Sequence, residues 1–112
     1  MNNQEKNSYV RSQILKALLE MMRVDNFDSI TISNLTAKAE VGRASFYRNY
    51  QTKEDVLRQE AERLNNELNN IRKNDDPNDY RLNLLRTLDF YKANSDFYMT
   101  VYNAGQTQII QD

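Results

Sequence analysis

The chain has 112 residues, with 15 lysines and arginines against 16 aspartates and glutamates, and it contains neither histidine nor cysteine. This length allows one small domain, or two helical layers that share a core. Without cysteine there are no disulfides or thiolate zinc sites, and without histidine the usual general base and commonest metal ligand are absent, so we expect neither an enzyme nor a cofactor.

Two further features limit the fold and the location. Two glycines and one proline are too few turn residues for an all-β fold. No apolar run approaches the ~20 residues that cross a bilayer, and the polar N-terminus has no secretory signal. We therefore expect an all-α, cytoplasmic protein without a membrane partner.

A first amphipathic helix is predicted over residues 8–24. Its apolar residues recur at spacings of three and four, and they are Val10, Ile14, Ala17, Leu18, Met21 and Met22. Asp25 and Asn26 end the pattern, and Phe27 and Ile30 are predicted core anchors beneath the connection.

A helix-turn-helix is predicted next. Thr31 is a suitable N-cap for a short helix that carries Ile32, Leu35 and Ala39 inward. Residues 40–42 interrupt the helical pattern, which resumes over residues 44–50. Phe46 and Tyr50 then share the core face, because they stand four residues apart. Two short helices joined by such a turn are typical of a helix-turn-helix.

Three more helices are predicted in the second half. Thr52 caps a long helix that ends near residue 74, before Asp75, Asp76 and Pro77. A fifth helix covers residues 78–93 with an apolar line of Leu82, Leu85, Leu88 and Tyr91. A sixth starts near Phe97 and ends at Ala104 and Gly105.

Charge is distributed unevenly along the chain. The net charge is −1, but residues 31–53 contain four cations, Lys38, Arg43, Arg48 and Lys53, against Glu40 alone. This segment therefore carries +3 and the remainder −4. The pattern suits a phosphate-docking surface on an acidic body, although a chance cluster on a solvated face is an equal alternative.

Residues 39–57 closely resemble the DNA-binding signature of the TetR/AcrR family of bacterial transcriptional regulators. The residues that match are Ala39, Val41, Phe46, Tyr47, Tyr50, Lys53, Glu54 and Leu57. Phe27, Ile30, Thr31 and Ile32 also fall where that family places them, so the resemblance covers about the first half of the chain.

Two departures from the family pattern concern the turn. Glu40 stands where glycine is usual, so a left-handed backbone there would carry a penalty of about 1 kcal/mol. Gly42 stands where serine or threonine is usual, which weakens the cap of the recognition helix.

The resemblance implies a double-stranded DNA operator as partner and assigns roles to nine residues. Thr31, Ser33, Tyr47 and Lys53 would contact phosphate, with Ser45 and Asn49 as further backbone contacts. Arg43 and Arg48 are the candidates for base readout, because a guanidinium can span the O6 and N7 acceptors of guanine, and Ala44 for a thymine methyl.

Simpler interpretations stay open for several of these side chains. Arg43 and Arg48 could be solvated or touch phosphate only, and Tyr47 could belong to the core. Lys53 could pair with an exposed carboxylate. Five aromatic residues of the second half could line an effector pocket, although core packing or a partner interface is at least as plausible; they are Phe90, Tyr91, Phe97, Tyr98 and Tyr102.

The resemblance further implies a repressor relieved by a small-molecule effector and a homodimer in the full-length form. We predict a helix-turn-helix DNA-binding domain over residues 1–53, followed by an incomplete helical regulatory and oligomerisation region over residues 54–112. The sequence leaves open whether the chain is a fragment or a short form. The alternative function is a helical protein–protein interaction module that has kept the fold without operator binding.

Overall fold

The computed structural model describes residues 2–111, and all regular structure in that range is helical. The elements are α1 (Asn3–Met22), the 3-10 turn η1 (Phe27–Ser29), α2 (Ile32–Ala39), α3 (Arg43–Asn49), α4 (Lys53–Lys73), α5 (Tyr80–Ala93), α6 (Ser95–Asn103) and α7 (Thr107–Ile110). The predicted all-α fold is confirmed. None of the described helices is long and apolar enough to cross a membrane.

Helix α1 begins at Asn3, earlier than the predicted Ser8. A capping box starts it: the amide of Glu5 donates to Asn2 Oδ1 over 2.8 Å, and the amide of Asn2 donates to Glu5 Oε2 over 3.3 Å. The apolar pattern could not locate this start, because the first turns carry polar side chains only and are held by the cap.

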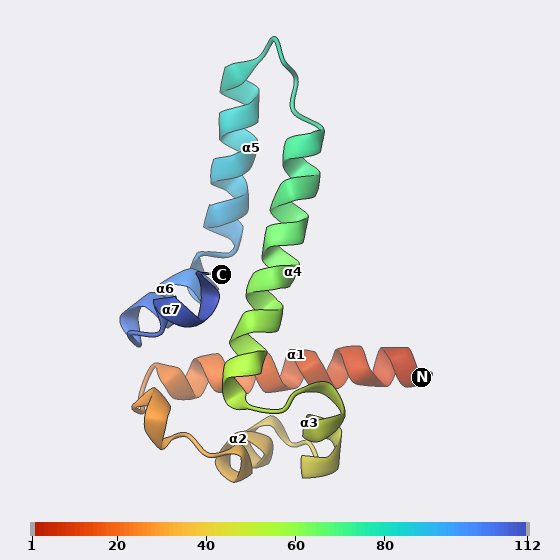
Figure 1. The fold of residues 1–112 in the computed structure, drawn as a ribbon, viewed down its shortest axis with the longest axis vertical. Coiled ribbons are helices and arrows are strands. Elements are labelled where there is room, and N and C mark those ends of the chain that lie inside the picture. Colours follow the sequence, from red (N-terminus) through yellow and green to blue (C-terminus); the bar gives the residue numbers. More distant parts are fainter. Residues whose placement is uncertain (1, 112) are drawn as a thin grey trace.

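The lower part of the molecule, residues 3–64, is here called the base. Figure 1 shows α1 lying across it, with α2 and α3 below α1 and with α4 rising from the far end of α3. Its core is closely packed, and the following side chains are at most 1% exposed: Ile14, Leu18, Leu35, Phe46, Val56, Leu57 and Leu64. The predicted anchors Phe27 and Ile30 are also buried, which confirms their role.

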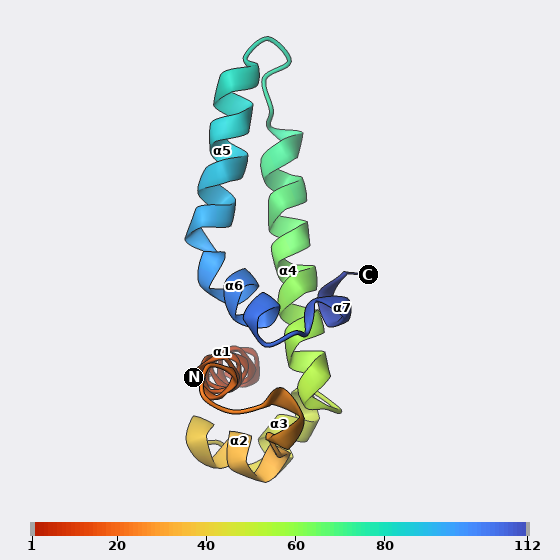
Figure 2. The same ribbon diagram turned by 90° about the vertical axis from the view of Figure 1, so that its left-hand side faces the viewer.

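The second half of α4, the connecting loop and α5 form an antiparallel hairpin, residues 65–93, that rises from the base (Figures 1 and 2). The less exposed positions of α5 are Asn83, Thr87 and Phe90, and only Phe90 is apolar. The predicted apolar line of α5 is 37–52% exposed. The leucines of this helix therefore lie outside the core of the described chain.

Two short helices close the space between base and hairpin. Helix α6 buries Phe97 and Val101 and packs against α1. It ends as predicted, because Gly105 adopts a left-handed backbone with φ of 72° and the amide of Gln106 donates to the carbonyl of Val101 over 3.0 Å. Helix α7, which has only four residues and showed no periodicity, returns along α4 (Figure 2).

Helix α4 begins at Lys53, one residue before the start of the predicted second region at residue 54, and its first turns belong to the same core as α1 and α3. The boundary between a DNA-binding and a regulatory domain stays a prediction.

Candidate nucleic-acid interface

The turn between α2 and α3 is a compact reversal of the backbone. Thr31 caps α2, since the amide of Asn34 donates to its Oγ1 over 3.1 Å. At the other end Glu40 is left-handed, with φ of 57° and ψ of 42°. The amide of Val41 then donates to the carbonyl of Thr36 over 3.1 Å. Glu40 therefore has a left-handed backbone at a position where the family pattern has glycine, and this conformation sets the direction in which α3 leaves the turn.

Helix α3 is anchored by one face and exposed on the other. Phe46 is fully buried and Tyr50 is 6% exposed, with ring centroids 5.5 Å apart. Gly42 offers no side-chain cap, so the first amides of α3 have no side-chain acceptor at the start of the helix. The opposite face consists of exposed side chains, namely Arg43, Ala44, Tyr47 and Arg48.

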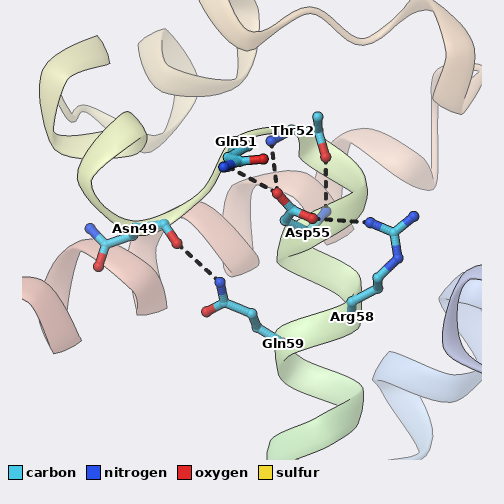
Figure 3. Close-up of polar contacts among 6 residues, drawn as sticks. All are labelled: Asn49, Gln51, Thr52, Asp55, Arg58 and Gln59. Carbon is cyan, nitrogen blue, oxygen red and sulfur yellow. Dashed lines mark hydrogen bonds and ion pairs between the residues drawn. The ribbon is translucent and has the colours of Figure 1, made fainter. Parts of the chain in front are cut away.

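A capping box fixes the start of α4 just after α3 (Figure 3). The Asp55 carboxylate accepts hydrogen bonds from the amides of Gln51 and Thr52 over 3.0 and 3.1 Å, and Arg58 Nη1 donates to it over 3.0 Å. Burial raises the pKa of Asp55, but these two amides and Arg58 together outweigh it, so the net pKa lies below its ordinary value.

The end of α3 is tied to both long helices through Asn49. Its carbonyl accepts a hydrogen bond from Gln59 Nε2 of α4 over 3.0 Å (Figure 3). Its side-chain Oδ1 accepts one from Arg11 Nη1 of α1 over 3.1 Å. These positioning residues, Arg11 and Gln59, were not predicted, because sequence spacing gives no sign of contacts across 38 and 10 residues.

The four cations of the basic segment have different surroundings. Lys38 pairs with Glu20 over 3.5 Å. Lys53 Nζ donates to the carbonyls of Phe27 and Ile30 over 2.6 and 2.9 Å and lies 4.6 Å from the ring centroid of Phe27. Within residues 2–111, Arg43 and Arg48 form neither ion pairs nor hydrogen bonds, and both are exposed. They are therefore the cations of this segment that the protein leaves available.

The nine predicted contact residues thus fall into two groups. The exposed ones lie along the start of α2 and the outer face of α3: Thr31, Ser33, Arg43, Ala44, Tyr47 and Arg48. Ser45, Asn49 and Lys53 are half-buried. Asn49 and Lys53 already bond within the protein, so a phosphate contact would use only their remaining N–H groups. DNA contact by all nine stays a prediction.

The predicted aromatic pocket residues do not form one group. Phe90 and Phe97 are buried in the core, and the rings of Tyr91 and Tyr98 lie beside them, tilted to each other with centroids 5.6 Å apart. Tyr102 is 66% exposed and lies outside this row. A role of these five residues in effector binding stays a prediction.

Residues 14–59 match a family model described as bacterial regulatory proteins, tetR family. The matched range runs from the middle of α1 to the second turn of α4, so it contains the helix-turn-helix and the junction that anchors it. Neither the curated proteins nor the solved structures gave a match.

Proposed function

Through residues 14–59 the chain belongs to the tetR family of bacterial regulatory proteins, which are DNA-binding transcriptional regulators, and we propose that it is a repressor that binds a double-stranded DNA operator through α2 and α3. The observation that carries the proposal is the outer face of α3. Four neighbouring side chains there are exposed, and the two arginines among them have no partner within residues 2–111.

Base readout falls to Arg43 and Arg48. Arg43 is the first residue of α3, and the N-terminal residues of a recognition helix are those that reach base edges in the major groove. Arg48 lies in the last turn, where its charge also interacts favourably with the helix dipole. Both guanidiniums are free to adopt the fork geometry that matches guanine.

Phosphate contacts fix the orientation on the duplex. Thr31 and Ser33 present hydroxyls and free amides at the start of α2, where the helix dipole attracts a phosphate. Tyr47 is 51% exposed, so its phenol can donate a hydrogen bond beside the arginines. Ala44 offers a methyl group on the same face for contact with thymine.

Homodimerisation and effector control are the further parts of the proposal. Two copies place their recognition helices in successive major grooves about 34–36 Å apart. Helix α5 has an exposed apolar line, with Leu84 59% and Leu88 52% exposed, and such surfaces are typical of association sites. An effector that favours one spacing of the two recognition helices would relieve repression, with α4 as the connecting element.

The test is fluorescence anisotropy of the full chain on duplex DNA from the region upstream of its gene, titrated with salt and unlabelled competitor. We expect competitor-resistant binding with a steep salt dependence. Arg43→Ala and Arg48→Ala should each lower affinity for the preferred sequence about tenfold or more.

Arg72→Ala is the matched control, because Arg72 is an exposed cation of the hairpin. It should leave affinity within about twofold. Equal effects of all three substitutions would show that the arginines of α3 act only as general charge. A complete absence of binding at low salt would favour the protein-interaction module instead.

A further inference from the structure

A half-open cleft of about 510 Å³ lies between α1 and α4, on the side of α3 that faces away from Arg43 and Arg48. Its walls come from α1, the α3–α4 connection and α4, and the lining residues are Ser8, Arg11, Ser12, Leu15, Tyr50, Gln59, Glu60 and Arg63. None of these is among the five aromatic residues predicted to line an effector pocket, and none lies on the outer face of α3. The cleft is therefore separate from the proposed DNA contacts.

The cleft contains one cation without a carboxylate partner. Arg63 is not that cation, because it donates to both carboxylate oxygens of Glu60, over 2.7 and 3.1 Å, and to Glu67 over 3.4 Å. Arg11 is half-buried and has no carboxylate partner within residues 2–111. Its hydrogen bonds go to Asn49 Oδ1 and Ser8 Oγ, which uses two of its five N–H donors. A guanidinium without a counter-ion in a cleft favours an anionic ligand.

Tyr50 supplies a second donor in the same cleft. The residue is 6% exposed, but its hydroxyl oxygen is accessible to solvent and forms no hydrogen bond within residues 2–111. Burial, partly opposed by Arg11 and reinforced by Glu60, raises the pKa of Tyr50 to about 12. The phenol therefore keeps its proton at neutral pH and can donate it in a hydrogen bond.

We propose that this cleft binds a small organic monocarboxylate, with its carboxylate at Arg11 and Tyr50 and its apolar part against Leu15. A single unpaired cation matches a single negative charge. Leu15 and the ring of Tyr50 provide an apolar surface beside the two donors. The cleft volume accommodates a molecule of several carbon atoms as well as its carboxylate.

The same contacts connect the cleft to DNA binding, a step that rests on the proposed function. Arg11 holds Asn49, the last residue of α3. A carboxylate bound to the free donors of Arg11 draws the guanidinium towards the cleft, which weakens its hydrogen bond to Asn49 and so loosens the end of α3 from α1. The ligand thereby lowers DNA affinity from behind the recognition helix. By linkage, DNA lowers the affinity for the carboxylate by the same factor.

Direct binding is tested by amide NMR titration of the full chain with benzoate and hexanoate, with benzyl alcohol as the uncharged control. We expect saturable shifts at Arg11, Ser12, Asn49 and Gln59 with the carboxylates only. Arg11→Gln, which keeps a donor for Asn49, should weaken binding about tenfold or more. Tyr50→Phe should weaken it about threefold to tenfold. Arg23→Gln, at the other end of α1, should have no effect.

Two results would overturn the site: saturable shifts with neither carboxylate, or equal binding by Arg11→Gln and the unchanged protein. The regulatory step is tested by adding the carboxylate that binds to the DNA complex. We expect DNA affinity to fall about threefold or more, and to be unaffected by the ligand in Arg11→Gln. Unchanged DNA affinity with the ligand bound would overturn the regulatory step. If the protein fails to bind DNA, the proposed function fails, while the titration decides the cleft independently.

Discussion

The base and the hairpin are built from similar residues but use them differently. In the base, leucines such as Leu18 and Leu35 are fully buried, and polar caps hold the helix ends. In the hairpin, Leu84 and Leu88 are more than half exposed, while Asn83 and Thr87 occupy less exposed positions of α5. The base is therefore stabilised within this chain, and the hairpin leaves apolar surface that needs another surface to cover it.

The largest expected effect contrasts two leucines. Leu35→Ala removes a fully buried side chain and should lower the free energy of unfolding by about 2–5 kcal/mol. Leu88→Ala, at a position 52% exposed in the single chain, should change it by at most about 0.5 kcal/mol at concentrations low enough to keep the chain monomeric. Urea denaturation followed by circular dichroism compares the two. A cost for Leu88→Ala as large as that for Leu35→Ala would mean that the outer face of α5 is buried in solution.

A smaller effect is expected from Lys53→Met. Methionine keeps an apolar stem near Phe27 but cannot donate to the carbonyls of Phe27 and Ile30. We expect a loss of about 1.5–3 kcal/mol in the free energy of unfolding. Lys73→Met, at the exposed end of α4 in the hairpin, is the control and should cost at most about 0.5 kcal/mol. Equal losses in denaturant titrations would rule out a structural role for the ammonium of Lys53.

A stabilising substitution is expected in the turn between α2 and α3. Glu40 is left-handed, so Glu40→Gly should remove backbone strain and raise the free energy of unfolding by about 1 kcal/mol. The same change at Glu62, an exposed position inside α4, should lower it by about 1 kcal/mol, because glycine disfavours a helix interior. Thermal unfolding should show shifts of opposite sign. A destabilising Glu40→Gly would mean that the glutamate side chain makes a stabilising contact in solution.

The smallest effect concerns acid stability. The pKa of Asp55 is lower in the folded chain than its ordinary value of 3.8. Its carboxylate therefore stabilises the fold above that value, and this contribution is lost as the pH falls through the folded pKa. Asp55→Asn should make stability less dependent on pH below about 4. Parallel acid-unfolding curves for Asp55→Asn and the unchanged protein would contradict this assignment.

Local features of the base could be predicted from the sequence because each depends on neighbouring residues. Thr31 and Thr52 cap the helices expected from their spacing, and Phe46 and Tyr50 share the buried face. Glu40 is left-handed at the position where the family pattern has glycine. Helix α7 was missed because four residues are too few to show a period.

The surroundings of individual side chains could not be predicted in the same way. The sequence did not indicate that Arg11 contacts Asn49, 38 residues away. It also did not indicate that Lys53 donates hydrogen bonds to the carbonyls of Phe27 and Ile30. Such contacts depend on how α1, η1 and α4 pack together, which no local pattern encodes. For the same reason, the sequence could list the exposed cations of α3 only as candidates, and their accessibility became visible in the fold.

Hydrogen exchange of the full chain, measured with and without its preferred duplex DNA, tests most directly the claim that the base is the stable, DNA-contacting region. Without DNA, amides of the base should exchange more slowly than those of residues 74–92. With DNA, additional protection should appear in residues 31–49 and be absent from α5. Protection by DNA that is confined to the hairpin, or that leaves residues 31–49 unchanged, would contradict the assignment of α2 and α3 as the DNA-binding surface.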